Sequence, residues 1–136
     1  MKFNHRILLF VLALALLFSF IWSRHTSCDS LNTVNASLEL TEGSRKLLGF
    51  NTDRDSLHFG TVSAGATVKK TIFINYTIPA EVLVTAKGQL SPWLLIEPQQ
   101  FKIIPLKTEE VTVQAVIPEA ATAGNYTGTV EFCFRE

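Results

Sequence analysis

Two cysteines are the residues of this chain most suited to covalent chemistry, and they are far apart in the sequence. Cys28 follows a long apolar run, and Cys133 lies in the last strand-like segment. Two cysteines in an exported segment predict a disulfide, because thiols pair in oxidising compartments. Closing so long a loop stabilises a fold by up to ~4–5 kcal/mol in the chain-entropy model. We favour an intramolecular Cys28–Cys133 bond; two free thiols or an intermolecular bridge are the alternatives.

Three asparagines begin the acceptor sequence for N-linked glycans. They are Asn35, Asn75 and Asn125, each followed two residues later by serine or threonine, with no proline between. Asn75 falls opposite the apolar parity of its segment and Asn125 lies in a Gly-Asn turn, so we expect both to be exposed. The alternative for Asn125 is a purely structural role in shaping that turn.

Residues for catalysis or metal binding are sparse. His58 is the one histidine beyond His25, and it alternates with Leu57 and Phe59, so we expect it to face solvent or a sheet edge as a structural residue. The sequence supports no Ser/His/Asp or Cys/His set around it. Two cysteines without neighbouring histidines fall short of the four ligands of a zinc site, and a copper site needs paired histidines as well. We therefore expect no catalytic residue, no metal and no cofactor.

The other polar and aromatic candidates have structural interpretations. Asp53 and Asp55 could contact Ca²⁺ weakly, but a calcium site needs six or more oxygens, so a solvated loop is the preferred interpretation. Glu109 and Glu110 suit charges at a strand edge, where they discourage edge-to-edge pairing. Trp93 suits the core of a sandwich better than a ligand platform.

These candidates follow an apolar segment that we expect to place the rest of the chain outside the cytoplasm. Residues 7–22 carry no charge and would form a helix of about 24 Å, somewhat short of the ~30 Å hydrocarbon core. Lys2 and Arg6 precede the run, which favours a cytoplasmic N-terminus. The run ends in bulky residues, and Trp22 and Arg24 suit the membrane interface. An uncleaved signal anchor is therefore favoured over a cleaved signal peptide.

Beyond Cys28, apolar residues alternate with polar ones, as in the strands of half-exposed sheets. The alternating sets are Val68, Ile72, Ile74 and Tyr76; Val111, Val113, Ala115 and Ile117; and Tyr126, Val130, Phe132 and Phe134. Shorter candidate strands are Ser37–Thr41, Ser56–Val62, Glu81–Lys87, Trp93–Ile96 and Phe101–Ile104. Glycine and proline turns separate these segments, which predicts an all-β, two-sheet antiparallel sandwich.

Several of these segments resemble one group of domains. Leu57–Gly65, LHFGTVSAG, resembles the LxFGxVxxG opening of immunoglobulin-like (Ig-like) domains in the ASH (Hydin-type) and major-sperm-protein-like group. Pro118–Val130, which ends in GNYTGTV, is similar to the closing motif of archaeal and bacterial extracellular Ig-like modules. The resemblance covers about residues 56–134 and departs after Asn75, where the group commonly has a short turn. It implies an Ig-like sandwich that binds or scaffolds without catalysis.

The net charge and the division of the chain into segments give two further expectations. The net charge is zero, with 12 basic and 12 acidic residues, so we expect no nucleic-acid partner. We divide the chain into a cytoplasmic stub with the signal anchor at 1–27, a juxtamembrane segment with the first strand or strands at 28–55, and the Ig-like core at 56–136.

These features together predict a non-catalytic scaffolding or interaction protein of the cell envelope. We expect a single pass through the membrane, with the N-terminus cytoplasmic and the β domain extracytoplasmic. Its partners would be the membrane and an envelope protein, with no small-molecule substrate. The alternative is a secreted or periplasmic chaperone or carrier, released by signal cleavage, and an enzyme is a third class that no motif supports.

Overall fold

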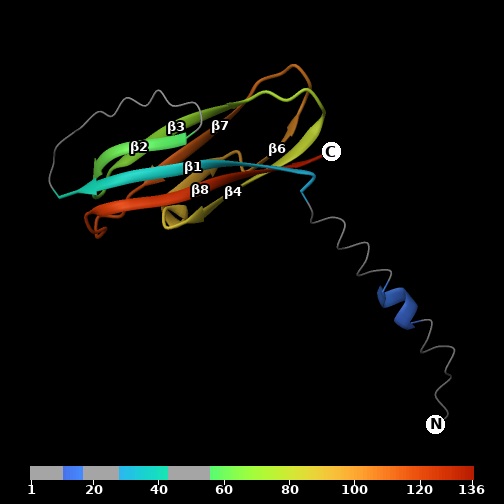
Figure 1. The fold of residues 1–136 in the computed structure, drawn as a ribbon, viewed down its shortest axis with the longest axis horizontal. Coiled ribbons are helices and arrows are strands. Elements are labelled where there is room, and N and C mark those ends of the chain that lie inside the picture. Colours follow the sequence, from blue (N-terminus) through green and yellow to red (C-terminus); the bar gives the residue numbers. More distant parts are fainter. Residues whose placement is uncertain (1–10, 17–27, 43–55) are drawn as a thin grey trace, which may run out of the picture.

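The fold is a pair of β-sheets packed face to face. The computed structural model describes residues 11–16, 28–42 and 56–136. A single turn of 3₁₀ helix, η1 (Ser91–Trp93), precedes the fifth strand. The expected all-β, two-sheet architecture is confirmed. The strands, shown in Figure 1, are β1 (Ser30–Thr41), β2 (Ser56–Ser63), β3 (Thr67–Ile74), β4 (Ala80–Gly88), β5 (Leu94–Glu97), β6 (Gln100–Ile103), β7 (Glu109–Val116) and β8 (Gly124–Arg135).

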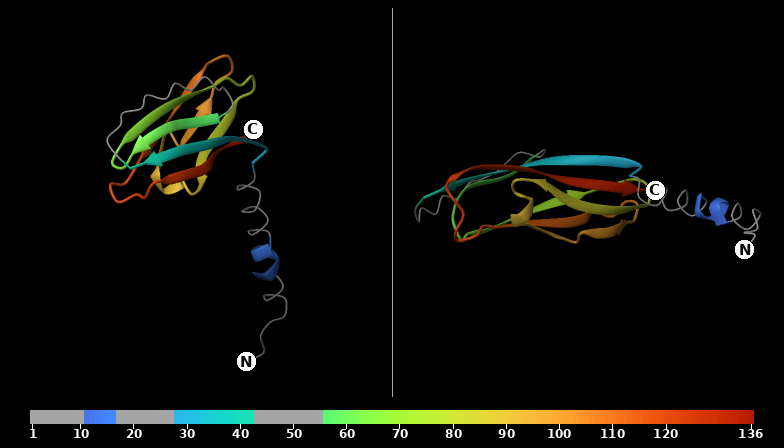
Figure 2. Two further views of the ribbon diagram at one scale, coloured as in Figure 1. Left: turned by 60° about the vertical axis from the view of Figure 1, so that its left-hand side comes forward. Right: turned by 90° about the horizontal axis from the view of Figure 1, so that it is seen from below.

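The larger sheet has five strands in the order β2-β1-β8-β4-β6, and the smaller sheet has three in the order β3-β7-β5. The 12-residue strands β1 and β8 pair antiparallel, from Ser30 opposite Phe134 to Leu40 opposite Gly124. Strand β4 pairs with the other side of β8. Figure 2 shows the two layers edge-on, with β1 and β8 side by side in one of them. Strand β8 therefore lies at the centre of the larger sheet.

Apolar side chains that alternate along the strands fill the space between the sheets. Val82 and Val130 of the larger sheet and Val111 and Val113 of the smaller sheet are fully buried. Burying one such side chain contributes about 1.5–3 kcal/mol. The predicted inward set of the seventh strand, Val111, Val113, Ala115 and Ile117, is buried throughout, and so are Val130, Phe132 and Phe134 of β8. The period-two pattern thus identified the inner faces of these strands.

The pairing of β1 with β2 differs from the expected antiparallel sandwich. These two strands run parallel, with Asn35 opposite Ser56 and Thr41 opposite Ser63. Parallel neighbours need a crossover of about a dozen residues or more, and the segment 42–55 between the strands is long enough to supply it. The antiparallel prediction was therefore wrong for this one pair.

Two boundaries also differ from the expected ones. Strand β1 begins at Ser30 and lies between β2 and β8, so the sandwich includes the segment that we placed ahead of its core. Trp93 belongs to η1 rather than to the strand predicted at Trp93–Ile96. Pro92 favours the start of such a helical turn, and the Trp93 backbone N–H donates to the Leu90 carbonyl at 2.9 Å.

The predicted anchor at 7–22 is described only in part. Residues 11–16 form a helical segment with exposed side chains, and the rest of the run lies outside the described residues. Within the ranges that the structure describes, no helix has the length and apolar character needed to cross a bilayer.

Candidate functional site

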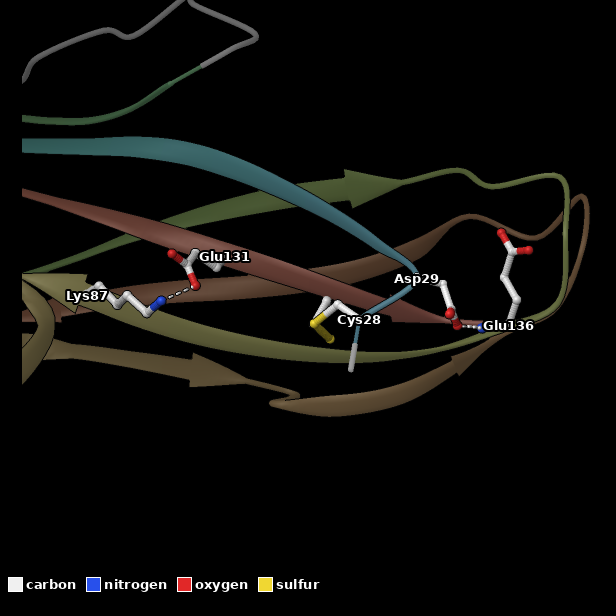
Figure 3. The surroundings of a disulfide bond; sticks show 6 residues. Cys28, Asp29, Lys87, Glu131 and Glu136 are labelled. Carbon is white, nitrogen blue, oxygen red and sulfur yellow. Dashed lines mark hydrogen bonds and ion pairs between the residues drawn. A yellow bond between two sulfur atoms is a disulfide. The ribbon is translucent and has the colours of Figure 1, made fainter. Parts of the chain in front are cut away.

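The disulfide fastens the start of the described β domain to its last strand. Cys28 and Cys133 are 105 residues apart, and their Cα atoms lie 5.3 Å from each other, within the range for a disulfide. Cys133 faces outward from the larger sheet but is only 7% exposed, and its bonded partner Cys28 lies on that outer face. Figure 3 shows the bond beside β8. The structure therefore agrees with the predicted intramolecular pairing.

Backbone contacts strengthen the same junction. The Asp29 N–H donates to the Phe134 carbonyl at 2.9 Å, and the Glu136 N–H donates to the Asp29 carboxylate at 2.9 Å. The second of these contacts is drawn in Figure 3. Together with the disulfide, they hold residues 28–30 against the end of β8. Whatever precedes Cys28 therefore joins the sandwich at a fixed position.

The outer face of the larger sheet contains two adjoining open hollows. Their volumes are about 390 and 460 Å³, and both are lined by Ser37, His58 and Thr127. We call this combined surface the polar hollow. It lies over β2, β1 and β8, at the half of the sheet away from the disulfide. The other lining residues whose polar side chains face outward are Asn35, Glu39, Thr61, Gln89, Asn125 and Thr129.

A β-bulge in β2 shapes the polar hollow. His58 pairs with Ser37 and Thr61 pairs with Glu39, so β2 has one more residue than β1 between these pairs. Gly60 lies in this bulge with φ +77°, a backbone conformation that glycine adopts at little cost. Because of the extra residue, two side chains three positions apart line the same hollow. The sequence pattern did not reveal this arrangement.

The hollow brings together a serine and a histidine that sequence reasoning did not connect. The Ser37 hydroxyl hydrogen-bonds to Nδ1 of His58, and the nearby Glu39 carboxylate accepts a 3.0 Å hydrogen bond from the Thr61 hydroxyl. Nucleophilic catalysis would also need positioned donors for an oxyanion. At Ser37 the strand β1 is paired on both sides, so its backbone lies within the sheet's hydrogen-bond ladder. The geometry therefore suits hydrogen bonding to a polar partner better than covalent chemistry.

Two of the three predicted glycosylation sites border this hollow. Asn35 lies in the middle of β1 and Asn125 near the start of β8, and both are exposed. Asn75 is also exposed, but it follows β3 at the other end of the sandwich. The expected exposure of Asn75 and Asn125 is confirmed. A glycan on Asn35 or Asn125 would occupy space in or beside the polar hollow.

Other predicted residues have the following positions. Asp53 and Asp55 lie outside the described residues. Trp93 is half-buried at the rim of the core, with its ring 4.5 Å from that of Tyr126. Strand β7 is the middle strand of its sheet, but its pairing with β5 ends at Thr112. Glu109 and Glu110 pair with β3 and extend beyond β5, which agrees with the expected edge position on that side.

Neither the arrangement of possible metal ligands nor the comparisons with known proteins indicate a further functional site. Across residues 11–16, 28–42 and 56–136, no group of three or more histidine, cysteine, aspartate or glutamate side chains could hold a metal ion. Comparisons of the chain with protein-family models, with curated proteins and with solved structures found no match.

Proposed function

We propose that this protein is a membrane-anchored, extracytoplasmic Ig-like module that binds another protein of the cell envelope without catalysing a reaction. The observation that carries the proposal is the disulfide between Cys28 and Cys133. Such bonds persist in oxidising compartments, and this one begins six positions after the uncharged run 7–22. An apolar N-terminal segment followed closely by a disulfide-bonded cysteine is expected of an exported domain.

The Ig-like assignment draws on the two-sheet architecture and on the motif at Leu57–Gly65. That segment forms most of β2 and the turn into β3, so it contributes packing and turn residues. Its apolar members, Leu57, Phe59 and Val62, are buried between the sheets. These are structural roles, which support a shared fold and assign no chemistry.

The polar hollow is the surface that we assign to the partner. It offers hydroxyl, amide, imidazole and carboxylate groups on a rigid sheet face, and such groups can pair with polar groups of a partner. Interfaces of this kind combine direct hydrogen bonds with ordered water. The hollow is also far from the junction at Cys28, so an anchored domain would present it away from the bilayer.

Topology and anchoring can be tested on cells that produce the native protein. After reduction, a membrane-impermeant maleimide added to intact cells or spheroplasts should modify Cys28 and Cys133. Labelling that occurs only after lysis would place the domain in the cytosol and overturn the proposal. Intact mass separates the two exported alternatives, because loss of residues 1–27 would favour the secreted chaperone or carrier.

The role of the hollow requires a matched pair of variants. Thr129→Arg inserts a long cation into the hollow, whereas Thr85→Arg places the same side chain on β4 of the same outer face. Neither threonine belongs to a glycosylation sequence. After cross-linking in intact membranes, T129R should recover about tenfold less partner, the effect of losing ~1.4 kcal/mol of binding free energy, and T85R should match the parent. Equal recovery by all three proteins would refute the assignment.

A further inference from the structure

Exposed apolar side chains are unevenly distributed over the sandwich. In residues 28–42 and 56–136, seven large apolar side chains are exposed. Two of them, Leu95 and Val116, lie on the outer side of the smaller sheet, in the half where β3 begins. The other five are Leu31, Phe73, Ile78, Ile104 and Leu106, and we call these the apolar rim.

Strand register places the whole rim at one end of the sandwich. Ser30 pairs with Phe134, Glu81 with Arg135, Ala80 with Ile103, and Ile74 with Glu109. Leu31 and Phe73 are each one residue from this row of pairs. Ile78 lies in the β3–β4 connection, and Ile104 and Leu106 lie in the β6–β7 connection. Figure 1 shows both connections at the end where β1 begins and the C-terminus lies.

Leu106, the most exposed residue of the apolar rim, lies in a turn with an unusual backbone conformation. The Lys107 N–H donates to the Ile104 carbonyl at 3.1 Å, with Pro105 and Leu106 between them. Leu106 has φ +68°, as at the third position of a type II turn, where glycine is the usual residue. Its side chain is 92% exposed. A leucine at this position is unfavourable for both the backbone conformation and hydration, which makes it a candidate contact residue.

The attachment point of the apolar run lies at this same end. The disulfide and the Asp29 contacts hold Cys28 beside the end of β8. Five residues, 23–27, separate Cys28 from Trp22. Even fully extended, that connection spans at most about 20 Å. If 7–22 is in the membrane, the end that carries the apolar rim cannot move far from the lipid surface.

We propose that the apolar rim inserts into the interface of the bilayer, so that the sandwich stands with its rim on the lipid and its polar hollow facing away. This inference rests on the membrane anchor proposed above. Interfacial anchors bury apolar side chains about 5–10 Å into the boundary between headgroups and acyl chains. Lys107 flanks Leu106, and its exposed amine lies 2.8 Å from the Glu109 carboxylate. To reach the headgroups while the leucine inserts, the long lysine side chain would exchange this ion pair for a lipid phosphate.

Contact quenching can test the insertion in the full chain. Trp22→Phe removes the tryptophan of the apolar run, and L106W and L95W are then compared in that background. Trp93 remains as a constant background, because its ring packs on Tyr126 at the opposite half of the sandwich. The proteins are reconstituted in phosphatidylcholine vesicles whose acyl chains are brominated near the headgroup.

The inserted residue should be quenched and the control should not. We expect the emission added by L106W to fall by about half, because a side chain in the interfacial layer meets the brominated segment. L95W should match the unquenched parent. If the chain floats with the vesicles while L106W remains unquenched, the rim proposal is overturned and the anchor is retained. If the chain does not float with the vesicles, the anchor itself fails. Circular dichroism and intact mass confirm that each variant is folded and disulfide-bonded.

Discussion

Removing the disulfide should cost this domain much of its stability. The double variant C28A/C133A opens a cross-link between residues 105 positions apart. In the chain-entropy model, a cross-link that closes a loop of this length lowers the entropy of the unfolded chain. Removing the cross-link restores that entropy and should destabilise the fold by about 4.7 kcal/mol. Domains of this size are stable by only ~5–15 kcal/mol. The expected loss is therefore between a third and nearly all of the total.

Urea unfolding of the full chain in detergent micelles, followed by circular dichroism, measures this loss. With a slope of about 1–3 kcal/mol per molar urea, the midpoint should fall by roughly 1.5–4.5 M. Reduced parent protein should unfold at the midpoint of C28A/C133A, and the reductant should leave the variant unchanged. A loss below about 1 kcal/mol would refute the reasoning that the cross-link acts on the unfolded chain.

Two further predictions concern single positions. Gly128→Ala should destabilise by about 1–3 kcal/mol, since the new Cβ would lie 2.7 Å from a carbonyl oxygen of β4, whereas the exposed control Thr85→Ala should have little effect on the urea midpoint. The hydrogen bond to Glu136, with its negative charge, raises the pKa of the Tyr76 phenol, so Glu136→Gln should lower that pKa, and ring-carbon NMR that finds no change would exclude the contact.

Local patterns in the sequence predicted much of the fold. Alternation at Val111–Ile117 identified the inner face of β7, and the same parity along β8 placed Cys133 on the outer face, where the disulfide lies. The prediction from alternation succeeds because successive side chains of a strand point to opposite faces, so the order of apolar and polar residues shows which face is buried. Glycine and proline marked the turns for a similar reason, since their backbone preferences are local.

Only the tertiary structure revealed which strands are neighbours. The contact of Ser37 with His58 follows from the parallel pairing of β1 with β2, and the bulge at Gly60 then places Thr61 opposite Glu39. Alternation specifies the face of a strand but not its partner or register, which are set by contacts between residues far apart in the chain. The same is true of the apolar rim. Leu31, Ile78 and Leu106 come from three separate segments, and only the folded sandwich brings them to the end where Cys28 is held.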